Sequence, residues 1–146
     1  MPAPSFDYAV IRVVPRVDRE EFVNAGVILF CLQKDFLAAR VEVDEARLRA
    51  LWPEVDVDLI RQHLEAIPRI CAGDPEAGPI ARLSIRERFH WLVSPRSTMM
   101  QVSPVHSGLC EHPERTLDDL FRRMVQAEPG KDDKDTRDTK DSKDKD

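Results

Sequence analysis

The order of the hydrophobic patterns is the strongest constraint on the fold. Runs rich in β-branched and aromatic residues lie at 6–14, 22–31 and 36–43. Such runs are typical of strands, and Pro15 ends the first of them. The link between the second and third runs is short and polar, which predicts an antiparallel hairpin. The chain is therefore expected to begin with an antiparallel sheet.

Asn24 and Gly26 interrupt the second hydrophobic run. A glycine inside a strand commonly marks a bulge, or a place where another backbone or a ligand comes close. We favour the structural bulge and keep the close approach of a backbone or a ligand as the alternative.

The hydrophobic pattern changes to a helical period after the third run. Asp44 is suited to cap a first helix that Pro53 stops. A second helix is predicted to begin near Asp56, because its apolar residues recur every three or four positions. Pro68 is expected to end or kink this second helix, since proline removes a backbone donor.

A loop and a third helix are predicted next. The stretch 71–81 is rich in glycine and proline, which indicates a loop. Ser84 and Glu87 have the spacing of a capping box and favour a helix over 84–93. A strand over the end of that stretch is the alternative.

The last two predicted elements are a short strand and a helix. Alternation over 100–103 indicates an extended edge segment that Pro104 stops. The closing helix, 112–127, has Pro113 in its first turn and apolar residues at helical spacing. Strands followed by helices indicate the α+β class. We expect an antiparallel sheet of three to four strands with helices packed on one face.

The end of the chain differs in composition from the rest. Residues 129–146 hold six of the 22 Lys and Arg, seven of the 27 Asp and Glu, and no side chain suited to a core. We therefore expect one α+β domain over 1–128 and a disordered charged tail over 129–146.

Charge and hydrophobicity limit the function classes. The net charge is -5 and no basic stripe is visible, which argues against nonspecific binding to duplex nucleic acid. No apolar run approaches the length of a bilayer span, and the first residues lack the pattern of a secretory signal. These features predict a cytoplasmic protein that does not associate with membranes.

The three cysteines do not form a recognisable site. They are Cys31, Cys71 and Cys110, with no CxxC pair, which argues against a disulfide framework or a zinc knuckle. Neither a metal nor a cofactor is expected. His106 and His112 flank Cys110, so a thiolate beside an imidazole is conceivable there, although packing is the favoured interpretation.

The segment 88–112 is the remaining candidate for binding, because the chain has no phosphate loop, dinucleotide fingerprint or hydrolase motif. An arginine fork beside hydroxyl groups can bind a phosphate or a carboxylate. The candidate binding residues are Arg88, Arg96, Ser97, Thr98, Gln101, Ser103 and His106. The alternative is structural: the hydroxyls satisfy a turn, Arg96 pairs with an acidic side chain, and His106 sits at the sheet edge. No residue is assigned a catalytic role.

Three segments form a pattern whose joint order is specific, although each segment alone is a weak signal. The segments are YAVIRVVP at 8–15, EEFVNAGVILFC at 20–31, and ERFHWLVSPRSTMMQVSPVHSGLCEHPERTLDDLFRRMV at 87–125. Together they resemble the bacterial domain of unknown function family 3037.

The resemblance implies a small cytoplasmic bacterial protein without assigned catalytic residues. It also implies relatives encoded beside kinase-fold proteins of the HipA type, which suggests a protein partner. We expect a noncatalytic binding or regulatory module that acts with such a partner. The alternative is a phosphate- or nucleotide-handling enzyme that uses the segment from Arg96 to His106.

Deletion of residues 129–146 is predicted to leave the fold intact, because these residues have no apolar side chain to bury. The melting temperature of the shortened chain should stay within about 2 °C of the parent value. A large loss of thermal stability, measured by circular dichroism, would show that the tail packs on the domain.

Overall fold

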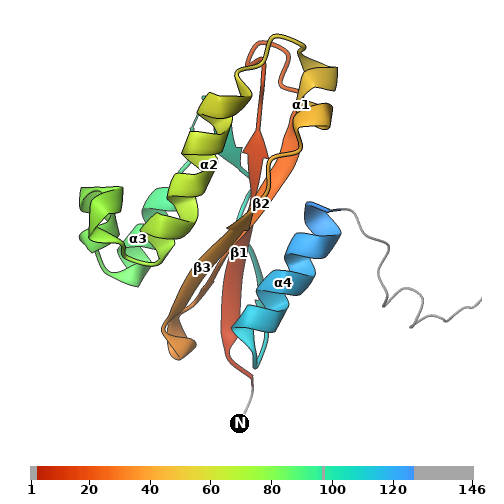
Figure 1. Cartoon of the computed structure of the whole chain (residues 1–146). Coiled ribbons are helices and arrows are strands. Elements are labelled where there is room, and N and C mark those ends of the chain that lie inside the picture. Colours follow the sequence, from red (N-terminus) through yellow and green to blue (C-terminus); the bar gives the residue numbers. More distant parts are fainter. Residues whose placement is uncertain (1–2, 97, 127–146) are drawn as a thin grey trace, which may run out of the picture.

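The first strand organises the sheet, because three other strands pair with it antiparallel (Figure 1). The computed structural model describes residues 3–96 and 98–126. The strands are β1 (Ser5–Val13), β2 (Val23–Cys31), β3 (Phe36–Val41), β4 (Met100–Val102) and β5 (His106–Leu109). Their order is β3-β2-β1-β4, and β5 pairs with the part of β1 that β4 leaves open.

The predicted bulge is present in β2. Ile11 pairs with Gly26 and Arg12 pairs with Asn24, so Ala25 is an extra residue on the β2 side. The close approach of another backbone, which was the alternative interpretation of Gly26, is also present. A Cβ atom there would lie 2.7 Å from the carbonyl oxygen of Arg40.

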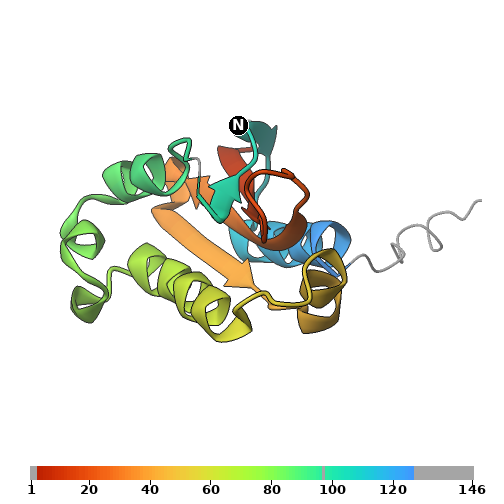
Figure 2. The ribbon, with the colours of Figure 1, turned by 90° about the horizontal axis from the view of Figure 1, so that it is seen from above.

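Side chains of β2 are buried on both faces of the sheet. Ile28 and Phe30 belong to one hydrophobic core, whereas Val27 and Leu29 belong to a second core. Three helices contribute residues to the first core and one helix to the second. Figure 2 shows from above that helices lie on both sides of the sheet. The helices are α1 (Glu45–Leu51), α2 (Val57–Cys71), α3 (Ile85–Leu92) and α4 (Pro113–Met124).

Two details of the predicted α+β architecture were wrong. The sheet has five strands instead of three to four, and α4 packs on the face opposite α1, α2 and α3. The physical reason for the second difference is the burial of β2. Apolar side chains on both of its faces require cover on both faces.

The predicted helix starts are confirmed by capping bonds. The side chains of Asp44, Asp56 and Ser84 accept hydrogen bonds from backbone N–H groups in the first turns of α1, α2 and α3. Ser84 and Glu87 form the complete capping box. Each cap satisfies a donor that a helix start would otherwise leave unpaired.

Pro68 does not end α2, which continues to Cys71. A proline near the end of a helix removes only one hydrogen bond. The last two residues of α2, Ile70 and Cys71, are buried, and their burial favours continuation of the helix past Pro68. The loop predicted over 71–81 begins after Cys71. It contains two short 3-10 turns, η2 (Pro75–Ala77) and η3 (Pro79–Arg82).

The strand β5 was not predicted. Its sequence, HSGL, has no hydrophobic alternation. Gly108 pairs with Phe6, and a Cβ atom at Gly108 would lie 2.9 Å from the Phe6 ring. The aromatic ring therefore covers the position where the strand has no side chain, as in the aromatic rescue of glycine in other sheets.

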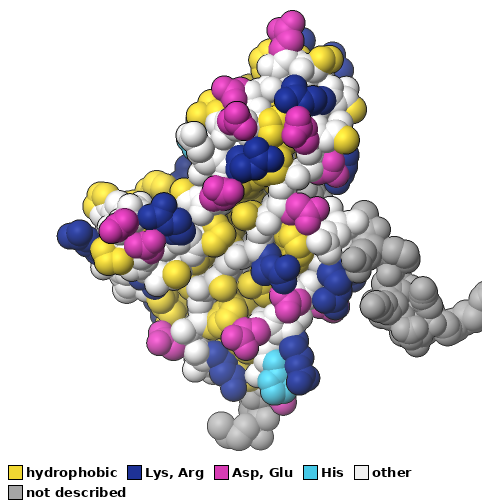
Figure 3. All heavy atoms as spheres, viewed as in Figure 1, with side chains coloured by type: hydrophobic (Ala, Val, Ile, Leu, Met, Phe, Trp, Pro, Cys, Tyr) yellow, Lys and Arg dark blue, Asp and Glu magenta, His cyan; other side chains and the backbone are white. Residues whose placement is uncertain are grey.

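Charged side chains are spread over the helices on the face seen in Figure 3, and hydrophobic side chains show between α3 and α4 over β3. Arg40 of β3 bridges this region to α4, with an ion pair to Asp118 and its guanidinium 4.7 Å from the Phe121 ring centre. Among the described residues, no helix is long and apolar enough to span a membrane. The predicted tail, 129–146, lies outside the described residues.

Replacement of Gly26 by valine should reduce the free energy of unfolding by about 1 to 3 kcal/mol. The reason is steric, because Gly26 has no positive φ and its absent Cβ leaves room for the Arg40 carbonyl. Urea unfolding measures the change, and Ala46→Val at an exposed position of α1 is the control. Equal midpoints for Gly26→Val and the parent would contradict the crowding at this position.

Candidate functional site

A pocket of about 360 Å³ lies on the α2 side of the sheet, between α2, α3 and β4. Its lining comes from four parts of the fold. These are β1 and β2 with Ile11 and Ile28, α2 with His63, Ala66, Ile67 and Ile70, α3 with Trp91 and Leu92, and the turn and strand with Arg96, Thr98, Met99, Met100, Gln101 and Val102.

The exposure of the lining residues shows which way the pocket opens. Ile11 and Ile28 are 1% and 0% exposed and form its base. Trp91 is 41% exposed and His63 is also exposed, so these two residues lie at the solvent side. The pocket is thus an apolar cavity closed by the sheet and open between α2 and the end of α3.

Arg96 is half-buried in the pocket wall and lies at the C-terminal end of α3. Its guanidinium donates hydrogen bonds to the carbonyls of Leu92 at 3.2 Å and Trp91 at 2.8 Å. The guanidinium also stacks over the Trp91 ring, 4.6 Å from the ring centre. These contacts add donors to carbonyls at the end of α3, where the Trp91 carbonyl also accepts from the Ser94 N–H, and they fix the position of the charge.

Thr98 and Gln101 also line the pocket, but their side chains are engaged locally. The Thr98 hydroxyl donates to the Met100 carbonyl at 3.0 Å. The Gln101 amide donates to the Thr98 carbonyl at 2.8 Å. Both side chains therefore hold the turn that leads into β4, and the neighbouring Ser97 lies outside the described residues.

Ser103 is buried between β4 and β5 and contacts β1. The Ser103 hydroxyl accepts a hydrogen bond from the Val10 N–H at 2.9 Å, and the backbone N–H of Ser103 donates to the Val10 carbonyl. Ser103 thus makes two hydrogen bonds to β1 at the position where the edge is interrupted before Pro104.

His106 lies on the opposite face of the sheet from the pocket. It pairs with Tyr8, and the two rings are in tilted contact with their centres 5.3 Å apart. Tyr8 packs against the core under α4, whereas Ile11 at the pocket base belongs to the core under α2. The structure therefore brings Arg96, Thr98 and Gln101 to one pocket and leaves His106 outside it.

Arg88 is also outside the pocket. One of its terminal nitrogens donates to the carbonyls of Ala81 and Leu83, both at 3.1 Å. These bonds join α3 to the turn η3 that precedes it. The position of Arg88 supports a role in holding this loop.

Of the 14 lining residues, sequence reasoning named Arg96, Thr98 and Gln101 and missed the other eleven, among them Trp91 and His63. The available signal was the helical spacing of His63 with Ala66, Ile67 and Ile70, which places one more side chain beside the apolar face of α2. Nothing in the sequence indicated that the C-terminal end of α3 would meet this face.

The strands β4 and β5 form an outer edge of the sheet. In the described part of the chain, each of them pairs only with β1. No Asp, Glu, Lys or Arg occurs from residue 98 to residue 110, although 34% of the chain is charged. Val105 and Leu109 on this edge are 42% and 68% exposed.

The thiol of Cys110 is buried and has no histidine among the groups that influence it. Burial raises its pKa, and the nearby Thr116 hydroxyl opposes this effect by hydrogen bonding. Burial also raises the pKa of the Cys71 thiol to about 12. In both cases the reactive thiolate is disfavoured at neutral pH.

Native Cys71 and Cys110 should react slowly with a soluble disulfide reagent at pH 8, because burial disfavours the thiolate and blocks access. In denaturing urea both thiols should react rapidly. Between pH 9 and about 12 the unfolded Cys71 ionises before the folded one, so this residue's contribution to stability should fall as the pH rises. Rapid labelling of Cys110 in the folded protein would support the thiolate interpretation instead.

Comparison with known proteins identifies a family model that matches the chain, and this family has no described function. The family model described as protein of unknown function (DUF3037) matches residues 8–125, from within β1 to the end of α4. No curated protein and no solved structure matched the chain. Within the residues that the structure describes, the family match covers all four helices and all five strands in whole or in part. The match stops before the predicted tail. The protein therefore belongs to the DUF3037 family.

Proposed function

We propose that the protein is a noncatalytic binding module that acts with a protein partner through the β4–β5 edge. The observation that carries this proposal is the uncharged edge from residue 98 to residue 110. Natural proteins commonly protect an exposed strand edge with charged side chains, because an unpaired edge can pair with another chain.

The exposed apolar side chains support the same proposal. Leu109 is the most exposed large hydrophobic residue of the described chain, and Val105 lies on the same edge. Transfer of such side chains from water to a partner surface is favourable in proportion to the apolar area that is buried. Hydrogen bonding along the open side of the strands would add direction to this contact.

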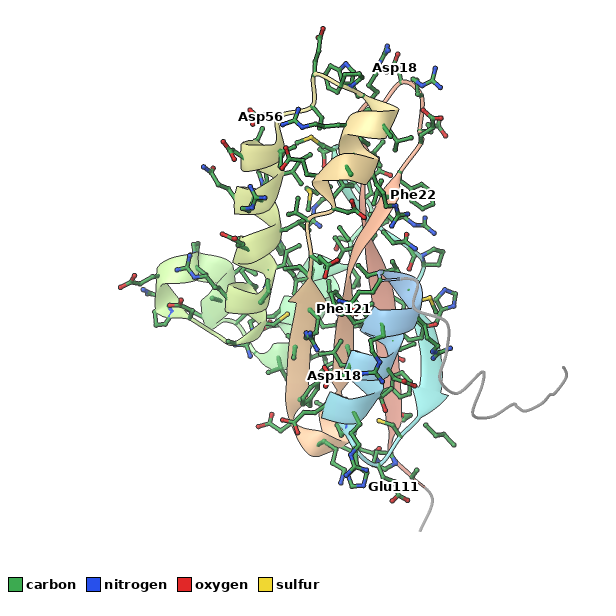
Figure 4. All side chains as sticks on the ribbon, turned by 45° about the vertical axis from the view of Figure 1, so that its right-hand side comes forward. Asp18, Phe22, Asp56, Glu111, Asp118 and Phe121 are labelled. Atoms are coloured by element: carbon green, nitrogen blue, oxygen red, sulfur yellow. The ribbon has the colours of Figure 1, made fainter. Side chains whose placement is uncertain are left out.

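The opposite edge of the sheet is built differently. β3 carries the charged residue Arg40, which pairs with Asp118, and it is flanked by α2 and α4. In Figure 4, Asp118 and Phe121 lie on α4 beside this edge. The contrast between the two edges favours the β4–β5 edge as the interaction surface.

The alternative of a phosphate- or nucleotide-handling enzyme requires Arg96 and His106 to act on one ligand. Arg96 lines the pocket under α2, whereas the His106 ring contacts the Tyr8 ring at the other face. No observation favours that alternative over a binding module. On the family resemblance, a kinase-fold protein of the HipA type is the first partner to examine.

Substitution of Leu109 by lysine should weaken partner binding at least tenfold, because it places a charge in a contact that would otherwise bury an apolar side chain. Leu109 is 68% exposed, so the fold should tolerate this change. The partner is identified by affinity capture from the native host and mass spectrometry. Its dissociation constant is then measured by calorimetry with both purified proteins.

Val17→Lys is the matched control. Val17 is 44% exposed and lies beside Asp18 at the end of the sheet opposite Glu111, as the labels in Figure 4 show. This variant should bind the partner as the parent does. Equal weakening by both variants, or by neither, would contradict the proposed surface. Light scattering would show whether the parent protein is a homodimer that Leu109→Lys dissociates. In that case the partner at this edge would be a second copy of the chain.

A further inference from the structure

The pocket under α2 has an unusual balance of charge for this protein. The whole chain has more acidic than basic residues, yet the lining contains Arg96 and His63 and no carboxylate. The other lining side chains are apolar, apart from Thr98 and Gln101. A cavity that is mostly apolar with a few placed polar groups is the usual form of a small-ligand site.

The size of the pocket is suitable for a small ligand. Its volume of about 360 Å³ lies within the range of about 300 to 1,000 Å³ that is typical of such sites. The base is formed by Ile11 and Ile28, with Ile67 and Ile70 on one wall and Met100 on another. An apolar group in this cavity would contact hydrocarbon side chains of both the sheet and α2.

The charge of Arg96 is held in place without being neutralised. Its guanidinium contacts two uncharged carbonyls and the face of Trp91. Among the described residues, no carboxylate forms an ion pair with it. A guanidinium has five N–H donors, so further donors remain for an anion. The fixed position reduces the loss of side-chain entropy when the anion binds.

The polar groups of the lining favour an anion with one charge. The Thr98 hydroxyl and one N–H of the Gln101 amide donate to backbone carbonyls of the turn, so few side-chain donors remain to surround a phosphate. A single planar guanidinium matches the single charge and the two oxygens of a carboxylate. We propose that this pocket binds an apolar monocarboxylate, with its hydrocarbon part over Ile11 and Ile28 and its carboxylate against Arg96.

The probes for this proposal are octanoate and octanamide, which have the same chain and differ in charge. Each is titrated into the full-length protein, with calorimetry for affinity and amide NMR shifts for location. Octanoate should bind at least about tenfold more tightly than octanamide, because only octanoate forms an ion pair with Arg96. Both probes should shift the signals of residues in the pocket.

Two variants separate the charge from the cavity. Arg96→Gln should bring octanoate affinity close to that of octanamide and change octanamide affinity much less, whereas Arg86→Gln on α3 should change neither. Ala66→Phe should weaken both probes, because the larger side chain fills part of the pocket, whereas Ala46→Phe on α1 should weaken neither. If Arg96→Gln fails to fold, Ala66→Phe and the comparison of the two probes still test the proposal.

The contrary results are distinct. Equal affinity of octanoate and octanamide would overturn the role of the carboxylate. No shift of pocket signals with either probe would overturn the site itself. Inorganic phosphate binding at Arg96 more tightly than octanoate would overturn the ligand class and favour a phosphate ligand. β4 contributes to both the pocket and the β4–β5 edge. The probes are titrated into the protein without a partner, so these results do not depend on partner binding.

Discussion

The rest of the structure depends on the burial of β2 between two hydrophobic cores. Val27 and Leu29 point to one side, Ile28 points to the other, and all three are completely buried. A strand buried on both faces needs helices on both faces, which accounts for the position of α4. β2 also contains a bulge at Ala25. The next residue, Gly26, has no side chain, and this leaves space for the carbonyl of Arg40. The same bulge presents Asn24, whose amide donates to the Met124 carbonyl and joins the strand to the end of α4.

Local signals in the sequence predicted most of the elements correctly, and tertiary contacts decided the remainder. The aspartate caps, the capping box and the bulge depend on neighbouring residues, so they could be recognised without a structure. The strand β5 could not, because it exists through pairing with β1 and through Phe6 covering Gly108. Pro68 misled the prediction of the end of α2, because burial of the residues after it is a property of the fold.

The candidate site was predictable only where its residues are close in sequence. Arg96 and Thr98 reach the same pocket because one turn carries both. His106 is separated from that turn by an irregular segment in which residues 103–105 lie opposite only Ala9 and Val10 of β1. One extra residue changes the alternation of faces, so extrapolation along the strand past Pro104 loses the register. The rest of the pocket comes from α2 and α3, and their approach is set by the hydrophobic core.

The β4–β5 edge combines exposure with partial protection. Leu109 and Val105 offer apolar surface, and no charge from residue 98 to residue 110 opposes the approach of another chain. The strands are nevertheless only three and four residues long, and Pro104 separates them. Short strands and proline limit extended pairing between sheet edges, which is the route to aggregation. An edge of this kind disfavours indefinite stacking of copies and still permits a compact contact with one partner surface.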